Sequence, residues 1–110
     1  MNIQIFGKNK CFDTKKAQRY FKERGVKFQY INLSEKAMSK GELTSVIRAV
    51  GGIGNLIDEN GRDFCDIKYL LDDAKLEKLL DEPLYMKTPI VRNSPDATVG
   101  YCPDKWKLWK

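Results

Sequence analysis

The sequence predicts a single α/β domain over residues 1–110, in which a mixed four-stranded sheet carries helices on both faces. Three observations support this fold: a strand, helix and strand open the chain, helical patterns fill its middle, and two extended segments close it. The first two strands need a helical crossover and therefore run parallel, whereas a tight turn joins the last two. With 42 % apolar residues, a chain of 110 residues can bury one core.

The opening unit is a strand, an amphipathic helix and a second strand. The alternating Ile3-Gln4-Ile5-Phe6 meets Gly7, which predicts a short strand that enters a loop. Over residues 14–24 apolar side chains recur at helical spacing among basic ones, and Gly25 ends the pattern. Residues 26–33 are rich in aromatic and β-branched side chains and predict the second strand.

The middle of the chain is predicted to be helical. Ser39 and Glu42 have the spacing of a capping box, and the helix that they open ends at Gly51-Gly52. Residues 55–65 are polar and rich in turn formers. Two further helices are expected, one with apolar residues at helical spacing over 67–74 and one over 75–80. Together these elements form an insertion of helices over about 39–82.

The last third predicts a hairpin and a short helix. Residues 89–91 and 98–101 are extended segments around a turn at 93–96. Pro103 suits the first turn of a terminal helix that carries Trp106 and Trp109 on one side. We expect these tryptophans to pack on the sheet rather than to stack on bases, so nucleic acid is not an expected partner.

Composition excludes several classes of protein. The chain has no histidine, which rules out Cys/His zinc sites and any imidazole base, and its three cysteines are too far apart for a paired metal knuckle. We expect no metal. A net charge of +5 favours anionic partners only mildly. No long apolar run and no signal-peptide pattern is present, so the predicted location is cytoplasmic, with no membrane contact.

Cys11 is the one position whose surroundings predict chemistry. It lies between the first strand and the first helix, where free backbone N–H groups and the helix dipole favour a thiolate. The flanking lysines, Lys8, Lys10, Lys15 and Lys16, add positive potential. Since the thiolate is the nucleophile, a lowered pKa and a reactive sulfur are expected, although a small apolar core residue is the competing interpretation.

Thr14 stands where a Cys-x-x-Cys motif would have its second cysteine. Its hydroxyl can cap the helix or donate to the Cys11 thiolate, and both interpretations stay open, but it cannot form a disulfide. A phosphatase of the Cys-x5-Arg type would need arginine at position 17, where this chain has Ala17. That class is excluded.

The opening segment Ile5-Phe6-Gly7-Lys8-Asn9-Lys10-Cys11-Phe12-Asp13-Thr14-Lys15-Lys16-Ala17 resembles that of the arsenate reductase (ArsC) and Spx family. Further segments are similar to the second strand, the capped helix, the stretch that leads to a proline at the sheet edge, and the closing strand and helix of that family. These segments are residues 25–30, 39–51, 84–91 and 99–106. The resemblance therefore covers nearly the whole chain.

The resemblance implies a thioredoxin-like fold with a helical insertion, a cis Thr88-Pro89 bond, and Cys11 as the nucleophile. It implies a small oxyanion or thiol as substrate, no bound cofactor, and glutathione or glutaredoxin as an external reductant. The substrate would be held by Lys10, Thr14, Lys15, Thr88, Pro89 and Arg92. The predicted function is a single-cysteine thiol oxidoreductase; the alternative, from the Spx branch, is a regulator that binds a protein such as RNA polymerase.

Two departures from the family pattern bear on these predictions. Arsenate reductases of this type hold the oxyanion with arginines, one of them directly before the proline, and here that residue is Thr88. Arg48, Arg62 and Arg92 remain, but we expect structural ion pairs for them. Spx proteins typically carry a Cys-x-x-Cys switch, which Thr14 removes. Cys65 or Cys102 could resolve an oxidised Cys11 only if brought within about 7 Å.

Overall fold

The sheet of this computed structural model has four strands in the order β2-β1-β3-β4. The structure describes residues 2–58 and 67–109. β1 (Ile3–Gly7) is parallel to β2 (Phe28–Asn32) and antiparallel to β3 (Ile90–Asn93), which pairs with β4 (Asp96–Val99). The predicted mixed α/β sheet is confirmed.

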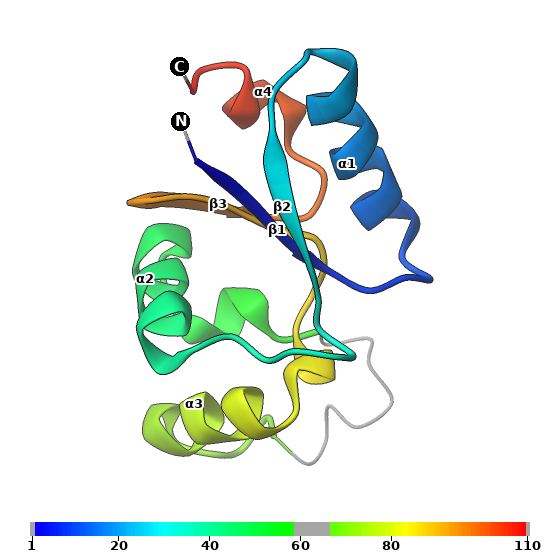
Figure 1. Cartoon of the computed structure of the whole chain (residues 1–110). Coiled ribbons are helices and arrows are strands. Elements are labelled where there is room, and N and C mark those ends of the chain that lie inside the picture. Colours follow the sequence, from blue (N-terminus) through cyan, green and yellow to red (C-terminus); the bar gives the residue numbers. More distant parts are fainter. Residues whose placement is uncertain (1, 59–66, 110) are drawn as a thin grey trace.

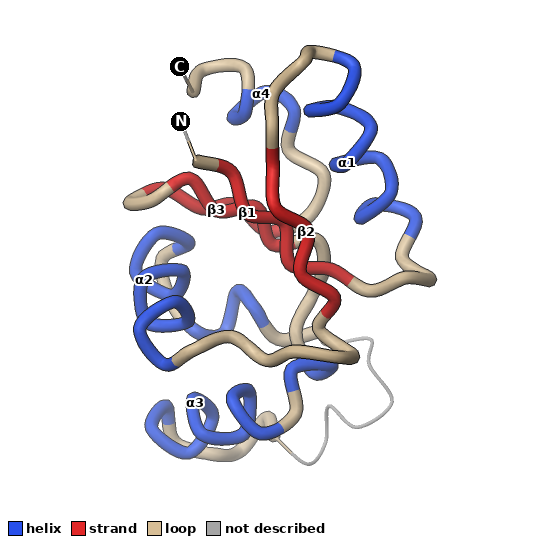
Figure 2. The backbone as a smooth tube through the Cα atoms, viewed as in Figure 1, coloured by secondary structure: helices blue, strands red, loops and turns tan. Residues whose placement is uncertain are grey.

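Helices cover both faces of this sheet (Figure 1). On one face lie α1 (Phe12–Glu23) and the short α4 (Pro103–Trp106). On the other lies α2 (Lys40–Val50), which contacts β4. The 3-10 turn η1 (Ile53–Leu56) contacts both α2 and α3 (Asp72–Asp81), and α3 also contacts the 3-10 turn η3 (Pro83–Tyr85), which follows it in the chain. α3 lies farther from the sheet than α2 (Figure 2).

Local capping signals set the ends of α2. The Ser39 hydroxyl accepts a hydrogen bond from the Glu42 backbone at 3.1 Å, and the Glu42 carboxylate accepts one from the Ser39 backbone at 3.0 Å. Gly51 follows the helix in the left-handed conformation with φ of 88°, which glycine adopts without a Cβ penalty. The predicted capping box is confirmed.

The region of α3 departs from the prediction of two helices. Residues 67–70 form a turn, Leu71 is the extended N-cap, and one helix follows from Asp72. Ile67 is buried from the turn, whereas Leu71 is 82 % exposed, so the helical spacing over 67–74 does not mark one buried face. Asp72 and Asp73 favour a helix start at this point because they complement the helix dipole.

The last hairpin lies close to its predicted place, with β4 ending at Val99 rather than at residue 101. Gly100 has a positive φ of 87° and its N–H donates to the Pro89 carbonyl at 2.8 Å, so the chain leaves the sheet there. Trp106 is 2 % exposed, and its indole N–H donates to the Thr98 hydroxyl at 2.7 Å. Trp106 packs in the core under α1, as expected, and the partly buried Trp109 packs against the same cluster. The prediction that both tryptophans lie on the terminal helix is wrong for Trp109, because α4 ends at Trp106.

No helix in the described part of the chain is long and apolar enough to cross a membrane.

Candidate active site around Cys11

Cys11 lies in the loop between the end of β1 and the start of α1. β1 ends at Gly7, and the backbone N–H of Cys11 donates to the Lys8 carbonyl at 3.1 Å, which closes a tight loop. Cys11 is the N-cap residue of α1, in extended conformation, and its side chain makes no capping bond. The half-buried sulfur lies at the start of α1 and contacts the segment that leads into β3.

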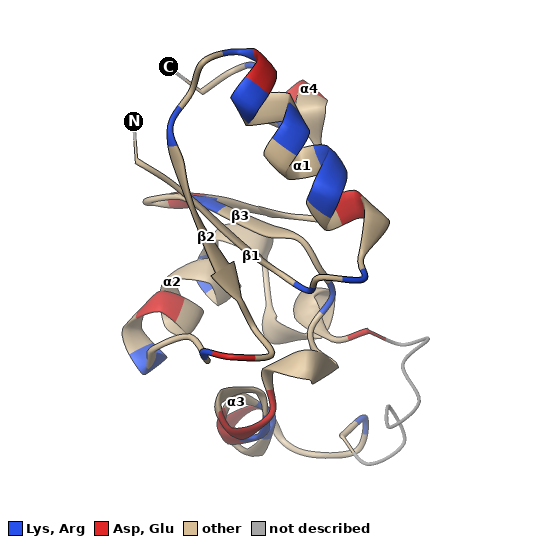
Figure 3. Cartoon of the chain, turned by 45° about the vertical axis from the view of Figure 1, so that its right-hand side comes forward, with Lys and Arg blue, Asp and Glu red and all other residues tan. Residues whose placement is uncertain are grey.

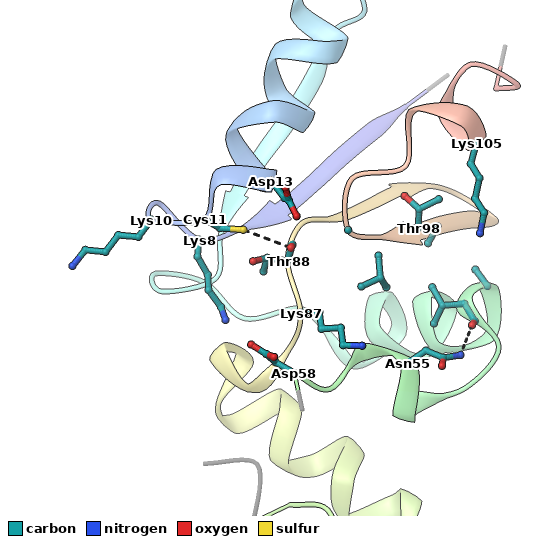
Figure 4. A pocket seen from close by; sticks show the side chains of 15 residues that line it. Lys8, Lys10, Cys11, Asp13, Asn55, Asp58, Lys87, Thr88, Thr98 and Lys105 are labelled. Atoms are coloured by element: carbon teal, nitrogen blue, oxygen red, sulfur yellow. Dashed lines mark hydrogen bonds between the residues drawn. The ribbon is translucent and has the colours of Figure 1, made fainter. Parts of the chain in front are cut away.

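The neighbour is the segment that enters β3. The Cys11 thiol donates to the backbone carbonyl of Thr88, with an Sγ to O distance of 3.5 Å (Figure 4). Pro89 follows Thr88 through a cis peptide bond, as the resemblance implied. Pro89 itself is buried. The pairing of β1 with β3 thus brings Cys11 and Thr88 together from opposite ends of the chain.

The pKa of the Cys11 thiol is lowered from its ordinary value. Burial of the sulfur raises the pKa, but hydrogen bonds to the thiolate outweigh burial. Their donors are the hydroxyls of Thr14 and Thr88 and the backbone N–H groups of Thr14 and Asp13. Thr88 therefore contacts both forms of the sulfur: its carbonyl accepts from the thiol, and its hydroxyl donates to the thiolate.

Thr14 is not the cap of α1, since Cys11 occupies the N-cap position. Thr14 lies in the first turn of α1 and is 1 % exposed, and its Oγ1 has no hydrogen-bond partner among the described residues, which leaves the hydroxyl available to the Cys11 thiolate. Gly7 makes room for it, because a Cβ added at Gly7 would lie 2.3 Å from Cγ2 of Thr14. Of the two roles left open by the sequence, the structure favours donation to Cys11.

The sulfur opens into a cleft of about 760 Å³. Ala49, Val50, Ala97 and Val99 give it an apolar floor at the end of α2 and along β4. Four lysines and two aspartates also line it: Lys8, Lys10, Lys87, Lys105, Asp13 and Asp58. The excess of basic side chains suits an anionic ligand or the thiolate itself (Figure 4).

The structure brings together only some of the residues predicted to hold a substrate. Lys10 and Thr88 line the cleft with Cys11. Lys15 instead places its ammonium 5.8 Å from the centre of the exposed Phe12 ring. Arg92 is also absent from the cleft lining: its Nη1 donates to Oε1 of Gln4 at 2.6 Å, on the sheet beside α2.

Among the described residues, no arginine lines the cleft. Arg48 lines a separate groove on α2, and Arg62 lies outside the described residues. The structure adds Lys87 and Lys105 to the site, which sequence reasoning missed. Lys87 could have been found because it directly precedes Thr88, whereas Lys105 arrives only through the packing of α4.

Cys102 does not line the cleft that holds Cys11. Cys102 is the N-cap residue of α4, and its thiol donates to the Val99 carbonyl at 3.3 Å. It packs against the core under α1, which supports the expected packing role. Cys65 lies outside the described residues. Among the residues that the structure does describe, no group of side chains could hold a metal ion.

Tyr30 anchors the loop that carries Cys11. Tyr30 lies on β2, which is parallel to β1, and its phenol O–H donates to Oδ1 of Asn9 at 3.2 Å. Burial raises the pKa of Tyr30, and the negative charges of Cys11 and Glu35 raise it further. Tyr30 therefore stays a neutral donor under conditions in which Cys11 is ionised.

Comparisons with known proteins agree with this arrangement. Residues 3–54 match the Glutaredoxin sequence family. The global transcriptional regulator Spx 2 of Oceanobacillus iheyensis is 29 % identical over 109 residues, which cover 94 % of this chain and 80 % of that protein. The resemblance to the ArsC and Spx family is thereby confirmed.

Solved structures of the ArsC type share the thioredoxin-like fold. An ArsC family related protein from Bacteroides fragilis has a TM-score of 0.86 at 17 % identity and covers 100 % of this chain and 98 % of its own. Arsenate reductase from Vibrio cholerae has a TM-score of 0.84 at 21 % identity, with 96 % and 94 % covered. The ArsC-like architecture is thus complete in this chain, while the basic groups of its cleft are lysines.

Proposed function

We propose that this ArsC-like chain is a single-cysteine thiol oxidoreductase that exchanges disulfides between small thiols through Cys11. The observation that carries the proposal is the state of the sulfur. It is half-buried at the start of α1, its pKa is lowered by hydrogen bonds that outweigh burial, and it opens into a basic cleft. A thiolate in such a setting is a nucleophile near neutral pH.

The reaction needs one cysteine and an external thiol. The Cys11 thiolate attacks one sulfur of a disulfide, the S–S bond breaks, and the departing thiolate takes a proton from water. Cys11 is then joined to the other half of the substrate in a mixed disulfide. A second thiolate, such as that of glutathione, attacks this mixed disulfide and releases Cys11. The external thiol is then joined to the substrate half in a new disulfide, so each cycle consumes one thiol and releases one thiol. A second external thiol that attacks this new disulfide completes the reduction, and only then are two external thiols oxidised to a disulfide for each disulfide reduced.

Two parts of the chain support this one-cysteine route. Thr14 occupies the place of a second cysteine in a Cys-x-x-Cys motif, and its hydroxyl can stabilise the Cys11 thiolate as leaving group. The Cys102 thiol is engaged with the Val99 carbonyl in the core under α1. The mixed disulfide on Cys11 is therefore expected to persist until an external thiol attacks it.

Arsenate is a poor match for this cleft. Specific recognition of a tetrahedral oxyanion relies on bidentate guanidinium contacts, and lysines offer only single, mobile charges. The cleft has lysines, and Arg92 is bonded to Gln4 instead. We expect no arsenate turnover in the presence of glutathione and glutaredoxin. A measurable rate that depends on Cys11 would overturn this part of the proposal.

The deciding experiment is a glutathione-coupled assay with hydroxyethyl disulfide. Wild type and Cys102→Ser should turn over, whereas Cys11→Ser should be inactive with an unchanged circular dichroism spectrum. Mass spectrometry of wild type treated with oxidised glutathione should show one added glutathionyl group, located on Cys11. Equal activity of wild type and Cys11→Ser, or an adduct on Cys102 only, would refute the proposal.

A second candidate function is that of a regulator that binds a protein partner such as RNA polymerase. It is favoured by the alignment with Spx 2 over 94 % of the chain and by Phe12, which directly follows Cys11 and is 77 % exposed. An exposed aromatic ring beside the sulfur is a typical contact residue. Binding of purified RNA polymerase by both wild type and Cys11→Ser, without thiol turnover, would favour this alternative.

A further inference from the structure

A second concavity lies between α1 and the segment that leads into α4. It is a groove of about 410 Å³. It is lined by Lys16, Arg19, Tyr20, Glu23, Arg24, Tyr101 and Pro103. The groove shares no residue with the Cys11 cleft, but Tyr101 of the groove directly follows Gly100 of the cleft in the chain.

The groove lies on the most basic layer of the molecule. Residues 12–27 carry six basic and two acidic side chains, whereas residues 72–82, around α3, carry two basic and five acidic ones (Figure 3). Within the described part of the chain, none of the basic side chains of α1 forms an ion pair. Their charge is therefore available to a partner.

Two of the three basic groups at the groove, those of Lys16 and Arg24, lie over aromatic rings. The Arg24 guanidinium lies 3.7 Å from the centre of the Tyr20 ring and donates to the Tyr20 carbonyl at 3.3 Å. The Lys16 ammonium lies 5.7 Å from the centre of the Tyr101 ring. Such contacts fix the position of the charges without neutralising them, which lowers the entropy cost of binding an anion.

The groove is better suited to carboxylates than to nucleic acid. Tyr101 is 43 % exposed, but its ring already contacts Lys16 and packs against Trp106 with centres 5.5 Å apart, so it offers no free stacking platform. The planar guanidinium groups of Arg19 and Arg24 can each donate two parallel hydrogen bonds to a carboxylate. The exposed Tyr101, together with Pro103, offers an apolar contact.

We propose that this groove binds an acidic segment of a partner protein, in which carboxylates contact Lys16, Arg19 and Arg24 and an apolar side chain packs on Tyr101 and Pro103. The groove is lined by α1, the helix that Cys11 opens, and by the segment after Gly100, so a partner in the groove contacts the same two parts of the chain that border the Cys11 cleft. The interaction itself does not require Cys11, so it stands or falls independently of the proposed thiol chemistry.

The test uses fluorescence anisotropy with a labelled peptide of alternating glutamate and leucine. Wild type should bind it, and Lys16→Glu/Arg19→Glu should weaken binding by about tenfold or more. The matched control Lys36→Glu/Arg48→Glu makes the same change in net charge with two exposed residues outside the groove, one of them on α2. It should weaken binding by less than about threefold. Cys11→Ser should bind like wild type.

Chemical shifts of the backbone amides then locate the peptide. Peptide-induced shifts should cluster at residues 16–24 and 101–103 and leave the floor of the Cys11 cleft unchanged. Equal weakening by both double variants, no binding by wild type, or shifts centred on the Cys11 cleft would overturn the proposal. Tighter binding of a single-stranded oligonucleotide than of the peptide, lost in the groove variant, would also overturn it in favour of nucleic acid.

Discussion

The sulfur of Cys11 lies 3.5 Å from the backbone carbonyl oxygen of Thr88, a residue 77 positions further along the chain. The contact joins the first turn of α1 to the segment that enters β3, and it exists because β3 pairs directly with β1. The thiol has an acceptor on the β3 side, and the thiolate has donors in the first turn of α1. Ionisation of Cys11 therefore exchanges one set of hydrogen bonds for the other.

The first prediction concerns the pH at which Cys11 reacts. Because hydrogen bonds from Thr14, Thr88 and the first turn of α1 outweigh burial and lower the pKa, alkylation by iodoacetamide should reach half its maximal rate below the pH of about 8.5 typical of a free thiol. The rate is measured by mass spectrometry from pH 5 to about 10. Cys11→Ser should remove this early phase, and Cys102→Ser should preserve it. An early phase that survives Cys11→Ser would assign the reactivity to another residue.

The second prediction isolates the Thr14 hydroxyl. Thr14→Val keeps the shape of the side chain and its packing on Gly7 but removes a donor to the thiolate, so the pKa of Cys11 should rise and alkylation at pH 7 should slow. Thr14→Ser should restore the fast reaction. Since the Thr14 hydroxyl has no hydrogen-bond partner among the described residues, Thr14→Val should change the free energy of unfolding by less than about 1 kcal/mol. An unchanged pH profile would show that Thr14 only packs.

Local signals explain which parts of this fold could be predicted from sequence. α2 was predicted at both ends because Ser39, Glu42 and Gly51 each act on backbone groups within a few residues. The region of α3 was not, because Ile67 is buried by contacts with distant residues and not by a place on a helix face. Spacing alone cannot distinguish these two causes of burial.

The same limit applies to the site. Cys11 was predictable because it follows a strand and opens a helix, whereas Thr88 was placed beside it only by the resemblance to the ArsC and Spx family. In the structure the pairing of β1 with β3 brings Thr88 to the cleft, which Lys10 also lines. Arg92 was misplaced because proximity along the chain to Pro89 was taken as proximity in space. Its register partner is Gln4, which lies between Arg92 and Glu42, so the guanidinium is held on the α2 side of the sheet. Lys105 reaches the cleft by tertiary packing that no local pattern encodes.

The third prediction concerns Gly7. A methyl group at this position would lie 2.3 Å from Cγ2 and 2.7 Å from Oγ1 of the buried Thr14. Gly7→Ala should therefore destabilise the protein by about 1–3 kcal/mol and also slow Cys11 alkylation, because Thr14 must move. Urea denaturation gives the free energy of unfolding. The control is Gly41→Ala in the first turn of α2, where a Cβ meets nothing within 4 Å; it should cause no loss of stability. Equal stability of the two variants would contradict the close contact.

The last prediction concerns the pH dependence of the stability that Glu42 and Ser39, the two residues of the capping box, each contribute. Burial raises the pKa of Glu42, but hydrogen bonds from the Ser39 backbone, the Ser39 hydroxyl and Gln4, together with the charge of Arg92, lower it overall. A carboxylate with a lowered pKa contributes stability above its ordinary pKa of about 4.3, and this contribution is lost as the pH falls through the lower, folded value. Glu42→Gln should therefore destabilise the protein at pH 7 and lose this effect at strongly acidic pH.

Ser39→Ala removes the other half of the box, whose hydroxyl does not titrate, and should cost about 1 kcal/mol with much weaker pH dependence. Denaturant melts at pH 7 and at the lowest pH where the protein stays folded measure both variants against wild type. Glu77→Gln, at an exposed position of α3, controls for the change in net charge. If Glu42→Gln and Glu77→Gln had the same pH dependence, the effect would come from net charge alone, and the Glu42 carboxylate would not bind its partners on α2 and the sheet.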